Sequence, residues 1–279
     1  MAEKVYEASF AESEDCIQSY ADFVAIVKQL RRDCPWDREQ THESVKHLLI
    51  EEAYEVVEAI DQRDWDELKK ELGDILLHVV FHSTIAEQAG RFTLQEVIEA
   101  ETDKLVRRHP HVFGDAVADD AATVLQTWEQ TKQQEDVDRP ALAGVPQHLP
   151  ALLRAQRVQE KAVGVGFDFM EAGDAWAKVE EEMAEFRAEV RPDGSGAAAE
   201  RVEEELGDVL FALVNYARFA EATPENALQR ATDKFMRRFA YVEAQVKAEG
   251  RTLADVALDE INTHWTAAKA QDASSDDAA

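Results

Sequence analysis

The stretch that decides the fold is EEELGDVLFALVN, residues 203–215. Its apolar residues recur at spacings of three and four, which is the period of an amphipathic α-helix. Glu205 and Asp208 lie off this apolar seam, and Asn215, seven residues after Asp208, falls nearly in line with it. Ala212, which lies between them, is small. The pattern predicts a helix that packs through one face and lines a polar cleft with another.

The same spacing of apolar residues continues along nearly the whole chain of 279 residues. Glycine (11) and proline (7), which interrupt helices, are both scarce. We therefore expect an all-α protein. Asp64, with Glu67 three residues later, has the sequence of a helix N-terminus, and Gly90 and Gly250 follow expected helix ends. The expected helices cover residues 19–32, 42–62, 65–89, 94–108, 121–134, 150–162, 172–190, 198–221, 224–249 and 254–270.

The chain also repeats itself. Residues 71–74 (ELGD) recur as 205–208, shifted by 134 positions, and residues 102–108 (TDKLVRR) recur as 232–238 (TDKFMRR), shifted by 130. Matches that keep their order and nearly keep their offset indicate two copies of one helical module. Further matches at similar offsets pair residues 50–55 with 180–185, Trp128 with Trp265, and Lys132 with Lys269.

Proline and glycine suggest where one copy ends. Residues 139–150, RPALAGVPQHLP, hold three prolines and a glycine and are the best linker candidate. We therefore predict an N-terminal domain at 19–138, a linker at 139–150 and a C-terminal domain at 151–270. The last residues, 271–279, are small and polar, and we expect them to form a disordered tail.

Acidic residues dominate the charge, with 58 Asp and Glu against 30 Lys and Arg and a formal net charge of -28. Such a surface repels phosphate backbones and anionic lipids, so we expect binding to neither nucleic acid nor membrane. The two cysteines, Cys16 and Cys34, are too few for a disulfide-rich secreted scaffold. The acidic N-terminus lacks the apolar core of a signal peptide, and no apolar stretch is long enough to cross a membrane. A soluble cytoplasmic protein is expected.

Paired acids in the second copy predict a metal site. A single Glu-x-x-Glu is common in so acidic a chain, but here an ordered set of acids occurs twice. Two antiparallel helices could bring Glu182, Glu185, Glu205 and Asp208 together. Four like charges that close repel one another unless a cation lies among them. Oxygen ligands without cysteine or paired histidine favour Mg²⁺ or Mn²⁺.

Basic residues further along predict a phosphate-bearing substrate. Carboxylate-bound Mg²⁺ commonly keeps open positions for water and phosphate. Lys234, Arg237 and Arg238 suit phosphate oxygens, although ordinary surface charge explains them equally well. Trp265 could stack on a base or pack in a core or interface, and the sequence does not choose between these roles.

Long motifs give the chain a family resemblance over about residues 20–270. They are CPWDREQTHESV (34–45), EEAYEVVEAI (51–60), ELGDILLHVVF (71–81), DKLVRRHPHVFGD (103–115), VGFDF (165–169) and EEELGDVLFALVN (203–215). The sequence resembles the MazG family of nucleoside triphosphate pyrophosphohydrolases. The resemblance implies tandem all-α MazG domains that pack as helical bundles in a homodimer. It also implies Mg²⁺-dependent hydrolysis of nucleoside triphosphates between the α- and β-phosphates, with broad or house-cleaning specificity.

The resemblance also assigns roles to single residues. The metal ligands of the family match Glu182, Glu185, Glu205 and Asp208, with Glu204 as a further candidate. Its nucleotide-binding positions match Lys178, Arg201, the run 234–238 and Trp265, and the polar cleft adds Asn215. One carboxylate, with Glu185 as a candidate, would orient or deprotonate the attacking water.

The first copy keeps its acids but differs around them. Glu52, Glu55, Glu71 and Asp74 are the equivalent metal candidates. Lys70, Phe81 and His78 stand where the second copy has Glu204, Asn215 and Ala212. These changes weaken a cation site or crowd a triphosphate, so we expect the second copy to carry most of the activity, unless the first serves a different substrate.

Two other functions compete with this interpretation. A di-iron carboxylate bundle needs Glu-x-x-His on two helices, and Glu39-Gln40-Thr41-His42 is the only such match in the chain. A non-enzymatic acidic scaffold or partner-binding protein would explain the charge and the helices. It would not explain why both copies keep the same acids and the same Lys-x-x-Arg-Arg.

Overall fold

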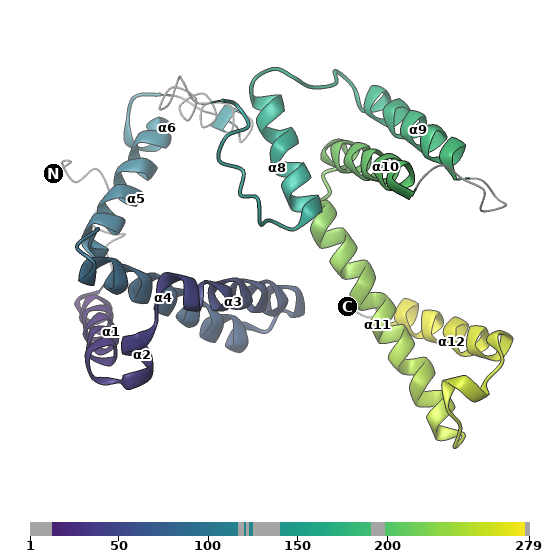
Figure 1. Cartoon of the computed structure of the whole chain (residues 1–279), viewed down its shortest axis with the longest axis horizontal. Coiled ribbons are helices and arrows are strands. Elements are labelled where there is room, and N and C mark those ends of the chain that lie inside the picture. Colours follow the sequence, from purple (N-terminus) through teal and green to yellow (C-terminus); the bar gives the residue numbers. More distant parts are fainter. Residues whose placement is uncertain (1–12, 117–119, 121–122, 125–139, 191–198, 277–279) are drawn as a thin grey trace. The chain divides into compact units, whose positions relative to one another are not determined.

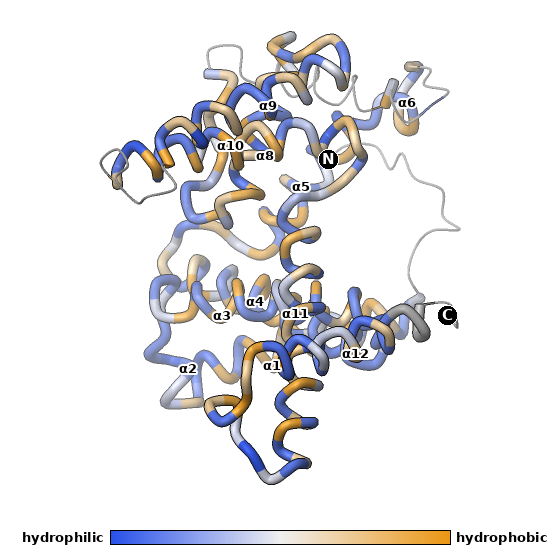
Figure 2. The backbone as a smooth tube through the Cα atoms, turned by 90° about the vertical axis from the view of Figure 1, so that its right-hand side faces the viewer, coloured by the Kyte–Doolittle hydropathy of each residue, from blue (hydrophilic) through white to orange (hydrophobic). Residues whose placement is uncertain are grey.

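The computed structural model describes residues 13–116, 120, 123–124, 140–190 and 199–276. These residues form helices and no strand, which confirms the predicted all-α class (Figure 1). The chain divides into two compact units, Met1–Val137 and Asp138–Ala279, and each is described by itself. Along the helices, hydrophobic and hydrophilic residues alternate, as amphipathic packing requires (Figure 2). None of the described helices is long and apolar enough to cross a membrane.

The first unit is built around a helical hairpin. In it, α3 and α4 pack against each other after a turn at Arg63, which adopts a left-handed conformation with φ of 56°. Thr41 caps α3 in a capping box with Ser44, and Asp64 caps α4, as the sequence predicts for Asp64. The helices of this unit are α1 (Glu14–Asp33), α2 (Pro35–Glu39), α3 (His42–Gln62), α4 (Trp65–Gln88), α5 (Leu94–Arg108) and α6 (Pro110–Phe113).

The second unit repeats the hairpin with α9 and α10, which lie side by side (Figure 1). After it, α11 runs on as a long helix, and α12 folds back against α11. Gly250 favours this reversal, because its φ of 72° is adopted at little cost by glycine, which has no Cβ. The elements of this unit are α8 (Ala151–Gly164), α9 (Ala172–Glu189), α10 (Ala199–Phe219), α11 (Pro224–Ala248), the 3₁₀ helix η2 (Leu253–Asp255) and α12 (Leu258–Asp276).

The sequence pattern misplaced several boundaries. The short helices α2 and α6 were missed, because Pro35 and Pro110 suggest breaks whereas proline also fits the first position of a helix. The helix expected at 254–270 begins at Leu258, after a 3₁₀ turn capped by Thr252. It continues to Asp276, into residues expected to be a disordered tail. The helix expected at 121–134, with Trp128 and Lys132, lies mostly outside the described residues.

The described part of the expected linker makes contacts within the second unit. The ammonium of Lys161 on α8 donates to the carbonyl oxygen of Ala143 at 2.9 Å. Leu142 lines a pocket of the same unit. The described part of this segment, residues 140–150, therefore contributes to the architecture around α8.

Candidate functional site

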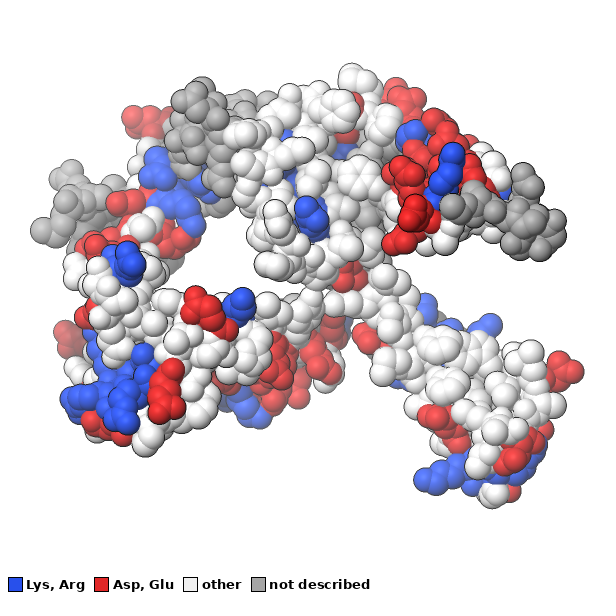
Figure 3. Space-filling view, in the orientation of Figure 1, with Lys and Arg blue, Asp and Glu red and all other residues white. Residues whose placement is uncertain are grey.

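The α9–α10 hairpin brings three predicted carboxylates together. Glu182 projects from α9, and Glu205 and Asp208 project from one side of α10 because they lie three residues apart. One oxygen from each lies within 4.8 Å of the others, and Glu182 is only 7% exposed. Acidic side chains gather on the face of α9 and α10 (Figure 3). The arrangement offers an all-oxygen ligand set for a hard cation.

The other two predicted ligands stand apart from this carboxylate cluster, which we define as Glu182, Glu205 and Asp208. Glu185 lies near enough for its charge to act on Glu205 but is not one of the gathered three. Glu204 is exposed and lies outside the group. The physical reason is helical geometry, because neighbouring residues point about 100° apart and Glu204 and Glu205 cannot share one face.

The acids in and beside the cluster repel one another, which contributes to the raised pKa of Glu205. Burial raises the pKa of Glu205, and the charges of Glu185 and Asp208 raise it further. The ammonium of Lys178 lies 2.7 Å from a carboxylate oxygen of Glu182 and 2.8 Å from one of Glu181. Hydrogen bonds to Glu181 and Glu182 raise the pKa of Lys178. A predicted nucleotide-binding lysine thus supplies the positive charge that the cluster contacts in this structure.

A pocket of about 520 Å³ opens beside the cluster. Its wall is mainly apolar, as in most small-molecule sites, with a few polar groups at one side. Asn215 and Ala212 both lie in the lining, at the positions where the sequence pattern placed a polar cleft. The lining residues are Leu142, Val158, Gln159, Ala162, Val163, Phe167, Asp168, Phe169, Lys178, Glu182, Asp208, Phe211, Ala212 and Asn215.

The sequence did not predict how the pocket is held in shape. Arg218 donates from Nε and Nη2 to Asn215 Oδ1, at 3.1 and 2.9 Å, and it also pairs with Asp168. Gln159 donates to the carbonyl oxygen of Phe211 at 2.8 Å. Asp168 belongs to VGFDF, a motif that the sequence linked only to the family resemblance. Arg218 lies ten residues after Asp208, the nearest acid of the predicted set, so the sequence gives no signal of such a contact.

The predicted residues of α11 and α12 lie away from the pocket of their own unit. Lys234 and Arg237 are exposed, and none of the predicted residues on these helices is among the pocket lining. Arg238 pairs with Asp272 on α12 at 2.6 Å, and Trp265 packs on Phe235 with ring centroids 5.1 Å apart. Arg201 at the start of α10 pairs with Glu189 at 2.9 Å. The structure therefore assembles only part of the predicted binding set.

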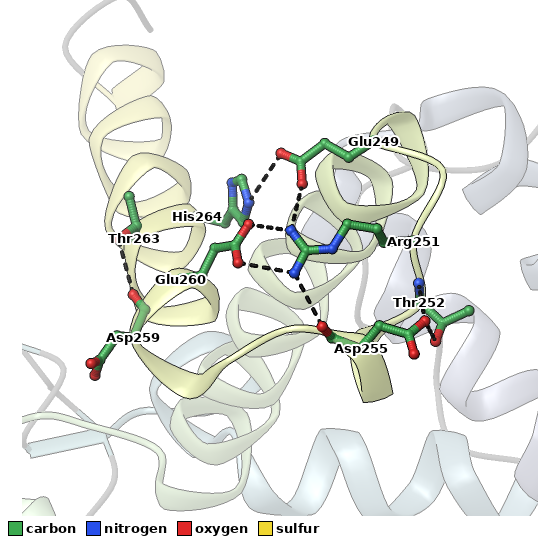
Figure 4. A network of polar contacts seen from close by, with 8 residues as sticks. All are labelled: Glu249, Arg251, Thr252, Asp255, Asp259, Glu260, Thr263 and His264. Carbon is green, nitrogen blue, oxygen red and sulfur yellow. Dashed lines mark hydrogen bonds and ion pairs between the residues drawn. The ribbon is translucent and has the colours of Figure 1, made fainter.

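A second acidic group of this unit surrounds the guanidinium of an arginine. Glu249, Glu260 and His264 have ligand atoms within 4.8 Å of one another, at the turn between α11 and α12 (Figure 4). The guanidinium of Arg251 lies among them and makes two bonds to Glu260, at 2.6 and 3.0 Å. It also bonds the carbonyl oxygen of Asp255 at 3.1 Å. Arginine already neutralises this group and fixes the hairpin turn.

The first unit forms an equivalent acidic group from Glu52, Glu55 and Glu71, which lie within 4.8 Å of one another. Burial raises the pKa of Glu71 to about 7, together with a hydrogen bond and charge from Glu55. Asp74 is not one of the three. Burial raises the pKa of Glu52, and the charge of Asp74 raises it further. Three of the four predicted acids therefore gather in each unit, but the fourth differs: it is Glu185 in the second unit and Asp74, the equivalent of Asp208, in the first.

The surroundings of the two acidic groups differ at the three positions that distinguish the two copies in the sequence. Phe81 is 7% exposed and belongs to the core of the first unit, and His78 is 8% exposed. These side chains occupy the positions that Asn215 and Ala212 hold in the pocket of the second unit. Lys70 pairs with Glu67 rather than with the acidic group.

Both units of the chain match a known protein domain. The MazG nucleotide pyrophosphohydrolase domain matches residues 40–113 and 174–242, once in each unit. The nucleoside triphosphate pyrophosphohydrolase/pyrophosphatase MazG of Thermotoga maritima is 41% identical over 257 residues, covering 91% of this chain and 96% of that protein. The nucleoside triphosphate pyrophosphohydrolase of Escherichia coli is 42% identical over 255 residues, covering 89% and 96%. Two domain matches and similarity along the full length show that the chain belongs to the MazG family.

Proposed function

We infer that this chain is a nucleoside triphosphate pyrophosphohydrolase, and we propose that it hydrolyses triphosphates such as ATP to a nucleoside monophosphate and pyrophosphate. The observation that carries the proposal is the carboxylate cluster at the edge of a ligand-sized pocket in the second unit. The names of the Thermotoga and Escherichia relatives support the same activity. House-cleaning of nucleotide pools is the cellular role that fits it.

The residues of the cluster suit Mg²⁺, with Mn²⁺ as the alternative. Their donor atoms are all carboxylate oxygens, which hard divalent cations prefer. The raised pKa of Glu205 has burial as its first cause and repulsion from neighbouring acids as its second, and a cation would relieve that repulsion. When bound, Mg²⁺ neutralises the triphosphate and lowers the pKa of a coordinated water.

The chain supplies the remaining functions of the site. Glu182, Glu205 and Asp208 hold the cation, and Glu185, at the border of the cluster, is placed to orient or deprotonate water. Lys178 can exchange its contact with Glu182 for a phosphate oxygen. The apolar wall of the pocket, which includes Phe167, accepts the base or sugar and limits the access of water.

The second unit exposes an apolar stripe on α10 that favours a homodimer. Leu206, Leu210 and Leu213 are 43, 44 and 40% exposed at spacings of four and three, so they share one side of the helix. The equivalent residues of α4, Leu72, Leu76 and Val79, are 52, 38 and 40% exposed. A repeated stripe of this kind is suited to helix packing against a second copy of the chain.

The dimer would also give a role to α11 and α12. Lys234, Arg237 and Trp265 do not line the pocket of their own unit, so their proposed contact with the nucleotide depends on the second copy. The proposed setting is the cytoplasm, where nucleoside triphosphates are found.

Product analysis tests the reaction. The full-length protein is incubated with each ribo- and deoxynucleoside triphosphate and Mg²⁺, and the products are separated by chromatography. We expect nucleoside monophosphate and pyrophosphate, and loss of turnover in EDTA. Release of nucleoside diphosphate and orthophosphate would contradict cleavage between the α- and β-phosphates. Undiminished turnover after chelation would contradict a role for the metal. No turnover with any nucleotide of the panel would favour a non-enzymatic scaffold.

A further inference from the structure

An arginine of the second unit joins two residues of the pocket wall. Arg218 on α10 donates from Nε and Nη2 to Asn215 Oδ1, at 3.1 and 2.9 Å. Its guanidinium also bonds both carboxylate oxygens of Asp168, which lies in the segment between α8 and α9. The side chains of Arg218 and Asp168 are only 18 and 28% exposed. Asn215 and Asp168 line the pocket, whereas Arg218 is not part of the lining.

These contacts determine which end of the Asn215 amide remains available. Arginine has only hydrogen-bond donors, so the atom that it contacts has to be the amide oxygen. Two donors occupy both lone pairs of Oδ1, and fixing one end of a planar amide also fixes the other. Nδ2 makes no hydrogen bond to any residue that the structure describes. Asn215 therefore offers a donor to a ligand, and not an acceptor.

The position of Asn215 along α10 places it toward the nucleoside end of a bound nucleotide. Asn215 lies seven residues after Asp208 of the carboxylate cluster, which is about 10 Å along a helix. A phosphate held at the cluster therefore leaves the sugar and the base to occupy the rest of the pocket. Phe167, Phe169 and Phe211 belong to the lining, and flat aromatic rings suit a base better than a sugar with its hydroxyl groups.

The first unit lacks both the asparagine and the arginine. Phe81 and Thr84 stand 134 residues before Asn215 and Arg218, at the equivalent positions of the repeat. Both are buried, at 7 and 4% exposed, and Phe81 belongs to the core of its unit. The two polar residues are thus replaced together where an aromatic ring occupies the equivalent position. Joint replacement is expected if the arginine serves the asparagine.

We propose that Arg218 is a positioning residue that orients the Asn215 amide, so that Nδ2 donates a hydrogen bond to the nucleobase of the substrate. The proposal rests on the proposed nucleotide hydrolysis and names the group that contacts the base. Asp168 holds the guanidinium from its second side. The common bases all carry ring nitrogens or carbonyl oxygens that accept hydrogen bonds. A fixed donor would therefore strengthen the binding of a base without selecting strongly among bases.

A substrate without a base tests the proposal. KM and kcat for pyrophosphate release are measured with ATP and with ribose 5-triphosphate, which keeps the sugar and the phosphates. Loss of Arg218 also uncovers the charge of Asp168, which acts on both substrates alike, so the readout is the ratio of the two KM values. We expect Arg218→Met to raise the ratio of the KM for ATP to that for ribose 5-triphosphate by about fivefold, as the loss of one hydrogen bond implies. The kcat for ATP should stay near the wild-type value.

A double variant separates positioning from a general structural role. Asn215→Ala should raise the ratio by the same factor as Arg218→Met. Combining the two should raise it no further, because the arginine acts through the asparagine. Arg154→Met removes an exposed arginine of α8 that is not part of the pocket lining, and it should keep the wild-type ratio. Circular dichroism checks that each variant keeps its helices.

The proposal is wrong if Arg218→Met changes both KM values by the same factor, if it changes neither, or if its effect on the ratio multiplies that of Asn215→Ala. A wild-type protein that releases no pyrophosphate would contradict the proposed function instead. Calorimetric titration with ATP and ribose 5-triphosphate in the presence of Ca²⁺ then gives the same ratio from Kd values. The two proposals are therefore tested separately, and absence of ATP binding by the wild-type protein would overturn both.

Discussion

Asp208 and Asp74 are equivalent residues with different surroundings. Asp208 lines the pocket of the second unit, whereas buried Phe81 and His78 occupy the corresponding space near Asp74. We expect Asp208→Ala to lower pyrophosphate release by at least about a hundredfold, because a proposed metal ligand is lost where charge develops. Asp74→Ala should leave most of the activity. The assay uses the nucleotide panel, and the opposite order of the two variants would overturn the assignment of the active unit.

The raised pKa of Glu71 predicts that the proposed metal binding by the first unit depends on pH. Burial, with a hydrogen bond and charge from Glu55, raises the pKa of Glu71 to about 7 from an ordinary value of 4.5. Between these values the folded chain holds a proton that the unfolded chain has released, so the free energy of unfolding falls as pH rises. Mg²⁺ must displace that proton below pH 7. We therefore expect Mg²⁺ to raise the melting temperature more at pH 8 than at pH 6.

The variant Glu71→Gln should reduce this difference, because its side chain does not titrate. Glu51→Gln, an exposed acid of the neighbouring helix, is the control and should keep the difference. Equal shifts at both pH values in the wild-type protein would contradict the prediction. The measurement is thermal unfolding with and without Mg²⁺.

Much of the carboxylate cluster could be predicted from single residues. Acids three residues apart share one side of a helix, so pairs of them on two packed antiparallel helices can meet, and Glu182, Glu205 and Asp208 do. The sequence could not exclude Glu204, because composition does not reveal which side of α10 faces α9. The pocket itself was mostly hidden. Leu142 and Phe167 come from segments without helical period, so no pattern brings them to α8 and α10.

Arg31 joins three helices, α1, α2 and α4. It is 6% exposed, and its guanidinium bonds the carbonyl oxygens of Asp37 and of Gln40, the latter at 3.1 Å. It also donates to Gln88 Oε1 on α4 at 2.8 Å and lies 5.2 Å from the centre of the Phe81 ring. These contacts hold the turn that contains α2 against α1 and α4.

We expect Arg31→Ala to lower the free energy of unfolding by about 3 kcal/mol, as the loss of several charged hydrogen bonds from a buried site implies. Arg32→Ala is the matched control, because the neighbouring side chain is 72% exposed and pairs with Asp33. Its unfolding midpoint in urea should stay at the wild-type value. Equal destabilisation by the two variants would show that Arg31 does not join the elements as described.

The sequence predicted the long helices well because their apolar period and caps are local properties. It did not predict the role of Arg31, since a buried arginine and a surface arginine look alike in a helix that ends with Arg31-Arg32-Asp33. The same limit applies to α2, whose five residues are too few to show a period.

At the scale of the whole molecule, the repeated apolar stripe predicts the assembly. A charge placed in the stripe would have to be buried against the second copy, which is costly. We expect Leu210→Glu and Leu76→Glu each to shift the chain from dimer toward monomer in sedimentation velocity experiments. Ile17→Glu, at a residue of α1 that is 58% exposed, should remain dimeric. A monomeric wild-type protein at micromolar concentration would contradict the proposed packing.

The contrast between Phe81 and Asn215 shows how duplication can divide work between two halves of one chain. One half keeps a hollow of about 520 Å³, and unfilled space in a protein interior costs stability. The other half has a packed aromatic ring at the same position. Natural selection often exchanges stability for activity at a site. Here the two demands need not be met by the same residue, because the ancestral position exists twice and each copy is free to satisfy one of them.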